Sequence, residues 1–258
     1  MPAVDHHATG TPCWVDLATP DPDDAVRFYT TVFGWGHETL PTSTGEPYHM
    51  FTKAGAHVAA CMRQMPEAAA QGAPAAWTTY LAGDADDVAV RAPAAGGQVL
   101  VAPFDVDGSG RMAIIAEPGG AVFGVWQARA HRGAQIVGEP GALVWNECNT
   151  SDLAATARFL EQVFGVETAD LPDFPTGYRT FSVGGEARGG ILQMTAEWEG
   201  IPPHWMTYFG VDDTDAACAA IADAGGKVSI PPFDSTFGRM AVVDDPQGAV
   251  FMVSSRQG

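Results

Sequence analysis

Apolar and polar residues follow one another along this chain in a regular order of strand and helix patterns. Residues 13–19 (CWVDLAT) alternate the two kinds of side chain, which predicts a half-buried strand. Over residues 22–34 the apolar residues recur at helical spacing, and Gly34 can end that helix. Residues 48–55 and 56–64 then read as a hairpin. The pattern therefore predicts a strand, a helix and further strands, in that order.

This order is repeated along the chain. Residues 76–83 read as a strand, 84–97 as a helix, 98–106 as a strand and 110–126 as a hairpin. The second half of the chain then aligns with the first nearly residue for residue. Matched residues include Trp14 with Trp145, Tyr48 with Tyr178, Tyr80 with Tyr208, Phe104 with Phe233, Arg111 with Arg239 and Phe123 with Phe251. Two copies half a chain apart indicate duplication, and each copy holds two modules.

The stretch 131–140 is polar, contains glycine and proline, and connects the two copies. We therefore expect an N-terminal domain over 1–130 and a C-terminal domain over 141–258, joined by this linker. A chain of 258 residues with 46% hydrophobic content can bury a core in each.

Charge and the lack of targeting patterns narrow the classes of partner. Acidic residues outnumber Lys and Arg by 31 to 13, for a formal net charge of −18, and such a field repels nucleic acid and anionic membranes. The N-terminus has no basic and apolar leader, and no stretch reaches the length of about 18 apolar residues that a membrane span needs. The four cysteines show no CxxC spacing. We expect a cytoplasmic monomer or homodimer with reduced thiols, which binds neither nucleic acid nor membrane.

Two motifs that occur once in each half resemble those of a known superfamily. One is a helix that begins at an aspartate and ends in V-F-G (Asp21 to Gly34; Asp152 to Gly165), and the other is a closing D/E-P-x-G-x-x-F turn (Glu117 to Phe123; Asp245 to Phe251). With these motifs the chain resembles the vicinal oxygen chelate superfamily of glyoxalase, bleomycin-resistance and extradiol-dioxygenase proteins. Within it, the chain looks most like the actinobacterial double glyoxalase-like proteins that are often labelled hydroxylases. The resemblance implies an α+β fold of four βαβββ modules, which form two pseudo-symmetric domains with curved mixed sheets, each enclosing a cup.

The resemblance also implies where a metal would be held. In that family the ligands are usually a His on the first strand of each module and a Glu or His on its last strand. Here those positions fall on Trp14, Thr78, Met62 and Gly124 in the first half and on Trp145, Met206, Leu192 or Gln193, and Met252 in the second. None is a carboxylate or an imidazole, whereas divalent metals need three or four converging donors. His37, His49, His57 and His204 show no H-x-H or H-x-x-x-H spacing, and the adjacent His6 and His7 fit a polar terminus. We therefore expect no metal and no cofactor.

Strand side chains alternate between faces, so the same positions fix which residues line each cup. Each cup then combines aromatic walls with one carboxylate and one phenol, which suits a small, planar, aromatic ligand. Burial raises the pKa of such a carboxylate toward the range useful for acid–base catalysis. The expected catalytic residues are Asp16, Tyr80, Glu147 and Tyr208, and the expected substrate-binding residues are Trp14, Thr78, Trp126, Trp145, Asn149, Met206 and Met252.

Several functions remain open at this point. The first is a metal-independent enzyme of hydroxylase, lyase, isomerase or cyclase type, acting on a small aromatic or polyketide-like metabolite by acid–base chemistry. The second is a protein that binds or sequesters an antibiotic without catalysis, like the bleomycin-binding relatives. A metal-dependent glyoxalase or dioxygenase is disfavoured by the residues at the ligand positions. The aromatic residues also fit a plain core, and the strand carboxylates also fit a bond to a backbone amide.

A pair of arginines occupies matching strand starts. Arg111 lies near Asp105 in the sequence, and Arg239 lies near Asp234. We expect structural ion pairs that hold the PFD loops, with anion binding as the alternative. These loops differ in sequence between the copies, so the two cups need not bind equally.

Overall fold

The computed structural model describes residues 4–43, 45–70, 72–171 and 177–255. The first half contains β1 (Pro12–Thr19), α1 (Pro22–Phe33), β2 (Gly36–Leu40), β3 (Tyr48–Lys53), β4 (Ala56–Arg63), α2 (Pro66–Ala70), β5 (Ala76–Ala82), α3 (Ala85–Ala94), β6 (Gln98–Val106), β7 (Gly110–Ala116) and β8 (Val122–Ala128). The second half contains β9 (Leu143–Thr150), α4 (Leu153–Phe164), β10 (Glu167–Asp170), β11 (Tyr178–Val183), β12 (Glu186–Gln193), the 3₁₀ turn η1 (Ala196–Trp198), β13 (His204–Gly210), α5 (Thr214–Asp223), β14 (Lys227–Ser235), β15 (Gly238–Asp244) and β16 (Val250–Ser255).

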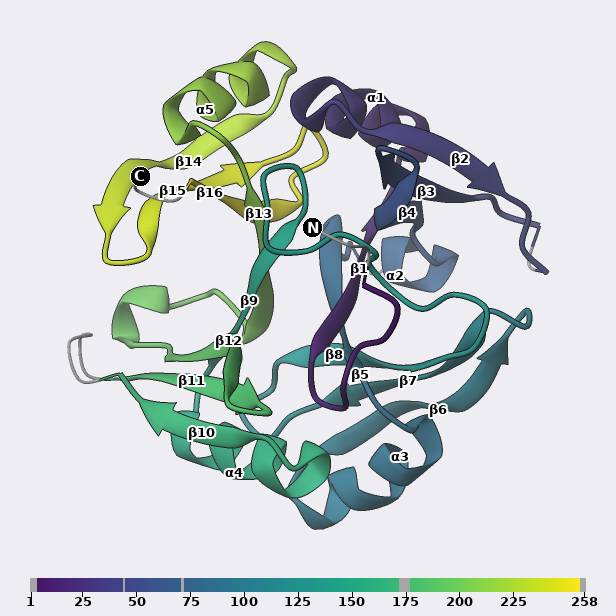
Figure 1. The fold of residues 1–258 in the computed structure, drawn as a ribbon, viewed down its shortest axis with the longest axis vertical. Helices are drawn as coiled ribbons and strands as arrows, with labels where there is room; N and C mark the ends of the chain where they lie inside the picture. Colours follow the sequence, from purple (N-terminus) through teal and green to yellow (C-terminus); the bar gives the residue numbers. More distant parts are fainter. Residues whose placement is uncertain (1–3, 44, 71, 172–176, 256–258) are drawn as a thin grey trace.

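Each half forms one open, mixed sheet of eight strands (Figure 1). The strand order is β2-β3-β4-β1-β5-β8-β7-β6 in the first sheet and β10-β11-β12-β9-β13-β16-β15-β14 in the second. The first strands of two modules meet antiparallel at the centre of each sheet, as β1 with β5 and β9 with β13, and each also runs parallel to the last strand of its own module. The expected α+β fold of four βαβββ modules is confirmed.

The long helices begin and end where the sequence motifs place them. Asp21 caps the N-terminus of α1 and Asp152 caps that of α4, each through a side-chain bond to a backbone N–H of the first turn. Gly34 and Gly165 end these helices in the left-handed region, with φ of 66° and 71°. A residue with a Cβ is strained at such angles, which explains the glycine in the V-F-G motif.

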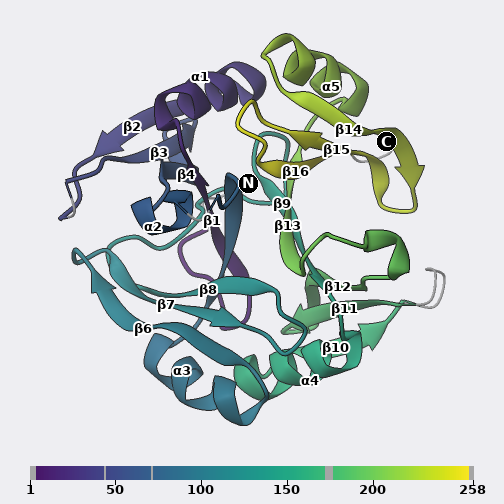
Figure 2. The ribbon, with the colours of Figure 1, turned by 180° about the vertical axis from the view of Figure 1, so that it is seen from behind.

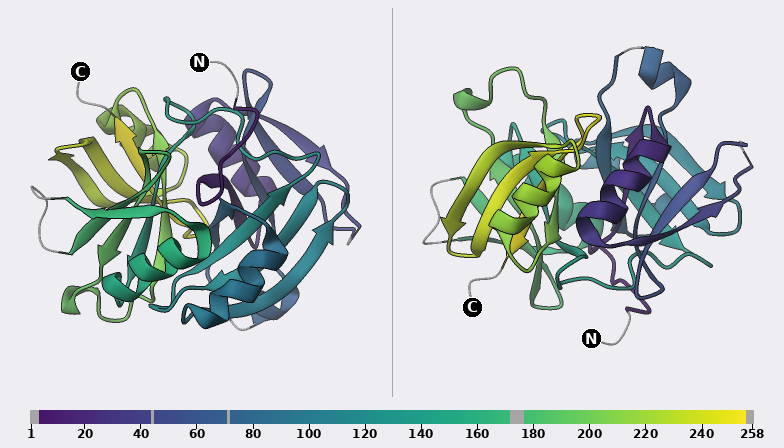
Figure 3. Two further views of the ribbon diagram at one scale, coloured as in Figure 1. Left: turned by 60° about the horizontal axis from the view of Figure 1, so that its bottom comes forward. Right: turned by 90° about the horizontal axis from the view of Figure 1, so that it is seen from above.

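Helices α1, α3, α4 and α5 pack on the convex faces of the sheets, and there the two halves share their cores. One core joins the first module to the fourth, so that α1 lies beside α5, and the other joins the second module to the third, so that α3 lies beside α4 (Figures 1 and 2). Figure 3 shows both helix pairs from further directions. Aromatic contacts cross between the halves, as in Tyr29 with Phe251 (ring centroids 5.7 Å apart) and Phe123 with Phe159 (6.2 Å). Each apolar core therefore requires both halves of the chain.

The closing turns of the repeat also connect the halves. Buried Asp245, in the turn before β16, accepts a hydrogen bond of 3.1 Å from the Tyr29 hydroxyl on α1. Buried Glu117, in the turn before β8, accepts one from the Thr156 hydroxyl on α4. Each carboxylate also accepts bonds from backbone N–H groups of its own turn. The acid of the D/E-P-x-G motif therefore shapes its turn and holds it to a helix of the other half.

Candidate functional site

The concave faces of the two sheets carry the residues expected to form the site. On β1, Trp14 and Asp16 belong to the concave face, whereas Val15 and Leu17 lie in the shared apolar core on the opposite face. We call the concave face of the first sheet the first cup, and that of the second sheet, around Glu147, the second cup. In the register of the central strands, Trp14 lies opposite Tyr80 in the first cup, and Trp145 lies opposite Tyr208 in the second.

In the first cup the structure joins Asp16 to two tyrosines. The Asp16 carboxylate accepts hydrogen bonds from the Tyr80 hydroxyl, at 3.1 and 3.3 Å, and from the Tyr48 hydroxyl, at 3.1 Å. Tyr48 in turn accepts a bond of 3.0 Å from the Trp14 indole N–H. Asp16 and Tyr80 are 6% and 7% exposed, so this network is almost fully removed from water.

The second cup repeats this arrangement with a longer carboxylate. Interactions with Tyr208 and Tyr178 oppose the effect of burial on the pKa of Glu147, and the Tyr178 hydroxyl accepts a hydrogen bond of 3.2 Å from the Trp145 indole N–H. Glu147 is 7% exposed, but Trp145 is only partly buried, whereas Trp14 is 2% exposed. The carboxylate and tyrosine pairs inferred from the sequence are therefore in contact in both halves.

Burial shifts these groups in the same direction in both cups. Desolvation raises the pKa of Asp16 from 3.8 to about 6 and that of Glu147 from 4.5 to about 7, against the opposing effect of the tyrosine hydrogen bonds. Burial, followed by the neighbouring carboxylate, also raises the pKa of Tyr80 and Tyr208 well above 10. Near neutral pH each cup can thus hold a carboxyl group that gains or loses a proton and phenols that remain hydrogen-bond donors.

Tyr48 and Tyr178 are functional candidates that the sequence analysis did not select, because it took site residues only from the first and last strands of the modules. They come from β3 and β11, one strand further from the centre of each sheet than β4 and β12. Their match across the repeat was the available signal, because both copies place a tyrosine there.

The other expected lining residues occupy register positions around these networks. Thr78 lies opposite Asp16, and Met206 lies opposite Glu147. Gly124 lies beside Tyr80, where a Cβ would meet the tyrosine ring at 2.1 Å, and Met252 is its counterpart beside Tyr208. Trp126 packs in the first cup and bonds to the backbone of the linker. The structure thus brings the expected substrate-binding residues onto the concave faces.

The linker between the halves crosses the first cup. We call residues 131–137 the strap. The His131 ring meets Trp14 edge-on, with centroids 4.4 Å apart, and its carbonyl oxygen accepts a bond of 2.9 Å from the Trp126 indole N–H. Burial lowers the pKa of His131 to about 4, so the ring is neutral. Backbone bonds from Ala134 to Cys13 (2.7 Å) and from Gln135 to His57 (2.8 Å) hold the strap across this cup.

The second cup carries a polar pair at one end. The side chain of Asn149, which is 1% exposed, lies 3.1 Å from the His204 ring, and His204 makes a second contact of 2.9 Å with the Pro202 carbonyl oxygen. The neighbouring surface has a cavity of about 510 Å³ lined by residues that include Trp198 and Ser151. A further cavity, of about 440 Å³, is lined by residues that include His7, Trp126 and Arg132. The two paired carboxylates line neither of these cavities.

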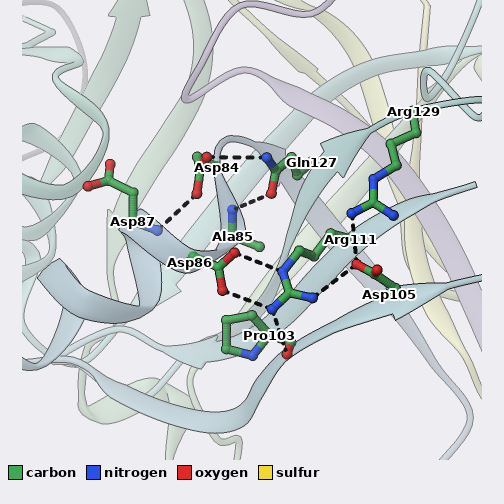
Figure 4. Close-up of polar contacts among 9 residues, drawn as sticks. All are labelled: Asp84, Ala85, Asp86, Asp87, Pro103, Asp105, Arg111, Gln127 and Arg129. Atoms are coloured by element: carbon green, nitrogen blue, oxygen red, sulfur yellow. Dashed lines mark hydrogen bonds and ion pairs between the residues drawn. The ribbon is translucent and has the colours of Figure 1, made fainter.

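The arginines of the PFD loops form the expected ion pairs. Arg111 bonds to Asp105 at 2.9 Å and to both carboxylate oxygens of Asp86 at 2.9 Å (Figure 4). Arg239 pairs with Asp234 at 3.0 Å and with Asp215 at 2.5 Å. Both guanidinium groups are therefore engaged by carboxylates, which confirms the structural ion pairs.

The donor set does not fit a family metal site. Within the described ranges, no three His, Cys, Asp or Glu side chains are grouped so that they could hold a metal ion. The thiols of all four cysteines are free and buried. Separately, none of the helices in the described parts of the chain has the length and apolar character needed to cross a bilayer.

Comparison with known proteins agrees with the fold. The model of the Glyoxalase/Bleomycin resistance protein/Dioxygenase superfamily matches residues 6–125 and 142–253. CFP32 of Mycobacterium tuberculosis, provisionally named a glyoxylase, is 42% identical over 98% of this chain and 97% of its own length. DnrV of Streptomyces peucetius, named an anthracycline biosynthesis protein, is 35% identical over 97% of this chain and 95% of its own. The Mn(II)-bound glyoxalase from Novosphingobium aromaticivorans, 20% identical, has a TM-score of 0.68 over 96% of this chain and 82% of that chain. The chain therefore belongs to the glyoxalase/bleomycin resistance protein/dioxygenase superfamily.

Proposed function

We propose that this protein is a metal-independent enzyme that moves protons on a small aromatic or polyketide-like metabolite, with the second cup as the main reaction site. The observation that carries the proposal is the buried Glu147 carboxyl on the concave face of the second sheet, beside Tyr208 and Tyr178, and burial raises its pKa to about 7. A carboxyl group with that pKa is half ionised near neutral pH, where a general acid–base group works best.

The residues define the type of step. The Glu147 carboxylate accepts a proton from an acidic C–H or O–H of the substrate, and the resulting carboxylic acid returns it to another substrate atom. Because their pKa values are raised, Tyr178 and Tyr208 stay protonated. Each hydroxyl has one hydrogen, which it can turn from Glu147 to a substrate oxygen that becomes negative once Glu147 has taken up the proton. Isomerisation, elimination and ring closure fit this exchange. A net hydroxylation needs an oxidant in addition to these groups.

The strap favours the second cup over the first. In the first cup the His131 ring already contacts Trp14, and the strap is held by backbone hydrogen bonds. Within the described chain, the apolar cluster of the second cup contains no strap residue, and its Trp145 is partly exposed. A ligand that enters the second cup therefore has no hydrogen-bonded strap residue of this cluster to displace.

The aromatic walls and the relatives indicate the substrate class. Indole and phenol side chains on a concave face favour planar rings. DnrV is named for anthracycline biosynthesis, which motivates a polycyclic aromatic substrate for this chain. The same walls also suit a protein that binds such a compound without changing it, so turnover is the property to test.

The test compares turnover and binding in matched variants. Purified protein is incubated in D₂O with anthraquinone-type polyketides, and mass spectrometry follows product formation and deuterium uptake. We expect Glu147→Gln to lower the rate by about a hundredfold or more while affinity changes little. Asp16→Asn, measured in parallel, should show the smaller loss. Glu167→Gln makes the same chemical change on the exposed strand β10 and should behave like wild type.

Two results decide against the proposal. Undiminished turnover by Glu147→Gln would remove Glu147 from the chemistry. Tight binding with no turnover in wild type would leave a sequestering protein. Metal independence is tested with the same assay, because the rate should survive incubation with EDTA, whereas a glyoxalase of the Mn(II) type would lose it.

A further inference from the structure

The two cups differ most clearly in one pair of positions. At one end of the second cup, Asn149 on β9 lies opposite His204 on β13. At the equivalent place in the first cup, Ala18 on β1 lies opposite Ala76 on β5. Asn149 shares the concave face of β9 with Glu147, because the two are separated by one residue. The second copy has thus placed a polar pair where the first has two methyl groups.

The contacts of His204 determine how the Asn149 amide is oriented. Nδ1 of His204 lies 2.9 Å from the Pro202 carbonyl oxygen, which can only accept, so this nitrogen carries the hydrogen. The Asn149 amide nitrogen, 3.1 Å from Nε2, can only donate, so Nε2 accepts its hydrogen bond. This arrangement turns the amide oxygen, Oδ1, away from His204.

The Asn149 oxygen is buried without a partner. The residue is 1% exposed, and its Oδ1 has no hydrogen-bond partner among the described residues. Buried amide oxygens are normally bonded, so this oxygen calls for a donor from outside the described residues. Residues two apart on a strand are separated by about 7 Å. An aromatic ring system of one or two rings spans the distance between this acceptor and Glu147.

We propose that Asn149 Oδ1 accepts a hydrogen bond from a phenolic hydroxyl of the ligand, and that His204 is a positioning residue that keeps this oxygen available. The assignment rests on the proposed use of the second cup and specifies its substrate as a hydroxylated aromatic compound. The cavity of about 510 Å³ lies next to the pair, since it is lined by Trp198, which contacts the His204 ring, and by Pro203.

Paired probes test this assignment directly. Tryptophan fluorescence titrations with 2-naphthol and 2-hydroxyanthraquinone are compared with those of their methyl ethers, which cannot donate. Wild type should bind the hydroxyl forms about tenfold more tightly, the effect of one buried hydrogen bond. Asn149→Leu should reduce this ratio to near one. Asn146→Leu, which removes a buried amide from the opposite face of β9, is the control and should keep the ratio.

The role of His204 has its own readout. His204→Phe should lose the hydroxyl preference without weakening the methyl ethers, because the amide is then free to turn. His204→Gln, whose side-chain oxygen can accept from the amide nitrogen, should restore it. The assignment is overturned if the wild-type protein binds the hydroxyl form of neither probe more tightly than its methyl ether. It is also overturned if Asn149→Leu keeps that preference. Because this is a binding ratio, it can hold even if Glu147→Gln shows that the proposed catalysis is wrong.

Discussion

Replacing Asp16 with asparagine should flatten the pH dependence of stability, because it removes a carboxyl group that titrates in the folded protein. Burial raises the pKa of Asp16 from 3.8 to about 6, so between these values the folded state holds a proton that the unfolded chain has lost. This contribution to stability is fully present below pH of about 4 and is lost as the pH rises through about 6. The part of the free energy of unfolding that Asp16 contributes therefore falls as the pH rises.

The size of the effect follows from the shift. A difference of about two pKa units lowers the free energy of unfolding by roughly 3 kcal/mol once the pH is above about 7. About half of this decrease occurs between pH of about 5 and pH of about 7.5. Asparagine is neutral at every pH and keeps an oxygen that can accept from Tyr48 or Tyr80. The variant should thus lose about 1.4 kcal/mol less than wild type over that interval.

Urea unfolding at the two pH values, followed by tryptophan fluorescence, measures this difference. Glu147 titrates in both proteins, so its contribution cancels in the comparison. Glu167→Gln on exposed β10 is the matched control and should keep the slope of wild type. If Asp16→Asn loses as much stability as wild type between the two pH values, the inference of a buried, titrating carboxyl in the first cup is refuted.

Three further predictions concern the framework of the cups. Gly124→Ala places a methyl group 2.1 Å from the Tyr80 ring and should cost about 1–3 kcal/mol, seen as a lower Tm in calorimetry; an unchanged Tm contradicts it. Tyr29→Phe removes the hydrogen bond that Tyr29 donates to buried Asp245 and the one that it accepts from the Trp77 indole. It should lower the free energy of unfolding in urea by about 2 kcal/mol, whereas the control Thr31→Ala, on the exposed side of α1, should change it little. Residues 1–137 or 138–258 expressed alone should give poorly dispersed NMR spectra, because each core needs both halves; a folded monomeric half would contradict this.

Much of the fold could be predicted because local patterns and the repeat agree. Asp21 and Gly34 mark the ends of α1 in the sequence as they do in the structure, and the repeat supplied the same limits for α4. The edge strand β2 was harder to identify, because all five of its residues are exposed and no apolar alternation remains. The shared cores could not be predicted from the sequence, because the apolar face of a helix is the same whether it packs against its own half or against the other half.

The site was predicted in part for a similar reason. The period of two along β1 and β9 placed Asp16 and Glu147 on the concave faces, and the tyrosines of β5 and β13 followed from their alignment. Tyr48 and Tyr178 were missed because their strands lie further from the sheet centre. The strap over the first cup depends on the path of residues 131–137 through space, which composition alone does not determine.

The exchange of cores between the halves has a consequence for how such a chain arose. The first module packs on the fourth and the second on the third, and Tyr29 reaches Asp245 just as Thr156 reaches Glu117. This reciprocity is the pattern of a two-fold symmetric homodimer. We infer that one half once corresponded to a subunit that paired with a second copy of itself, and that duplication joined the two partners in one chain. After fusion the concave faces, which the union did not require, could diverge into one cup closed by the joining segment and one with a polar pair of its own.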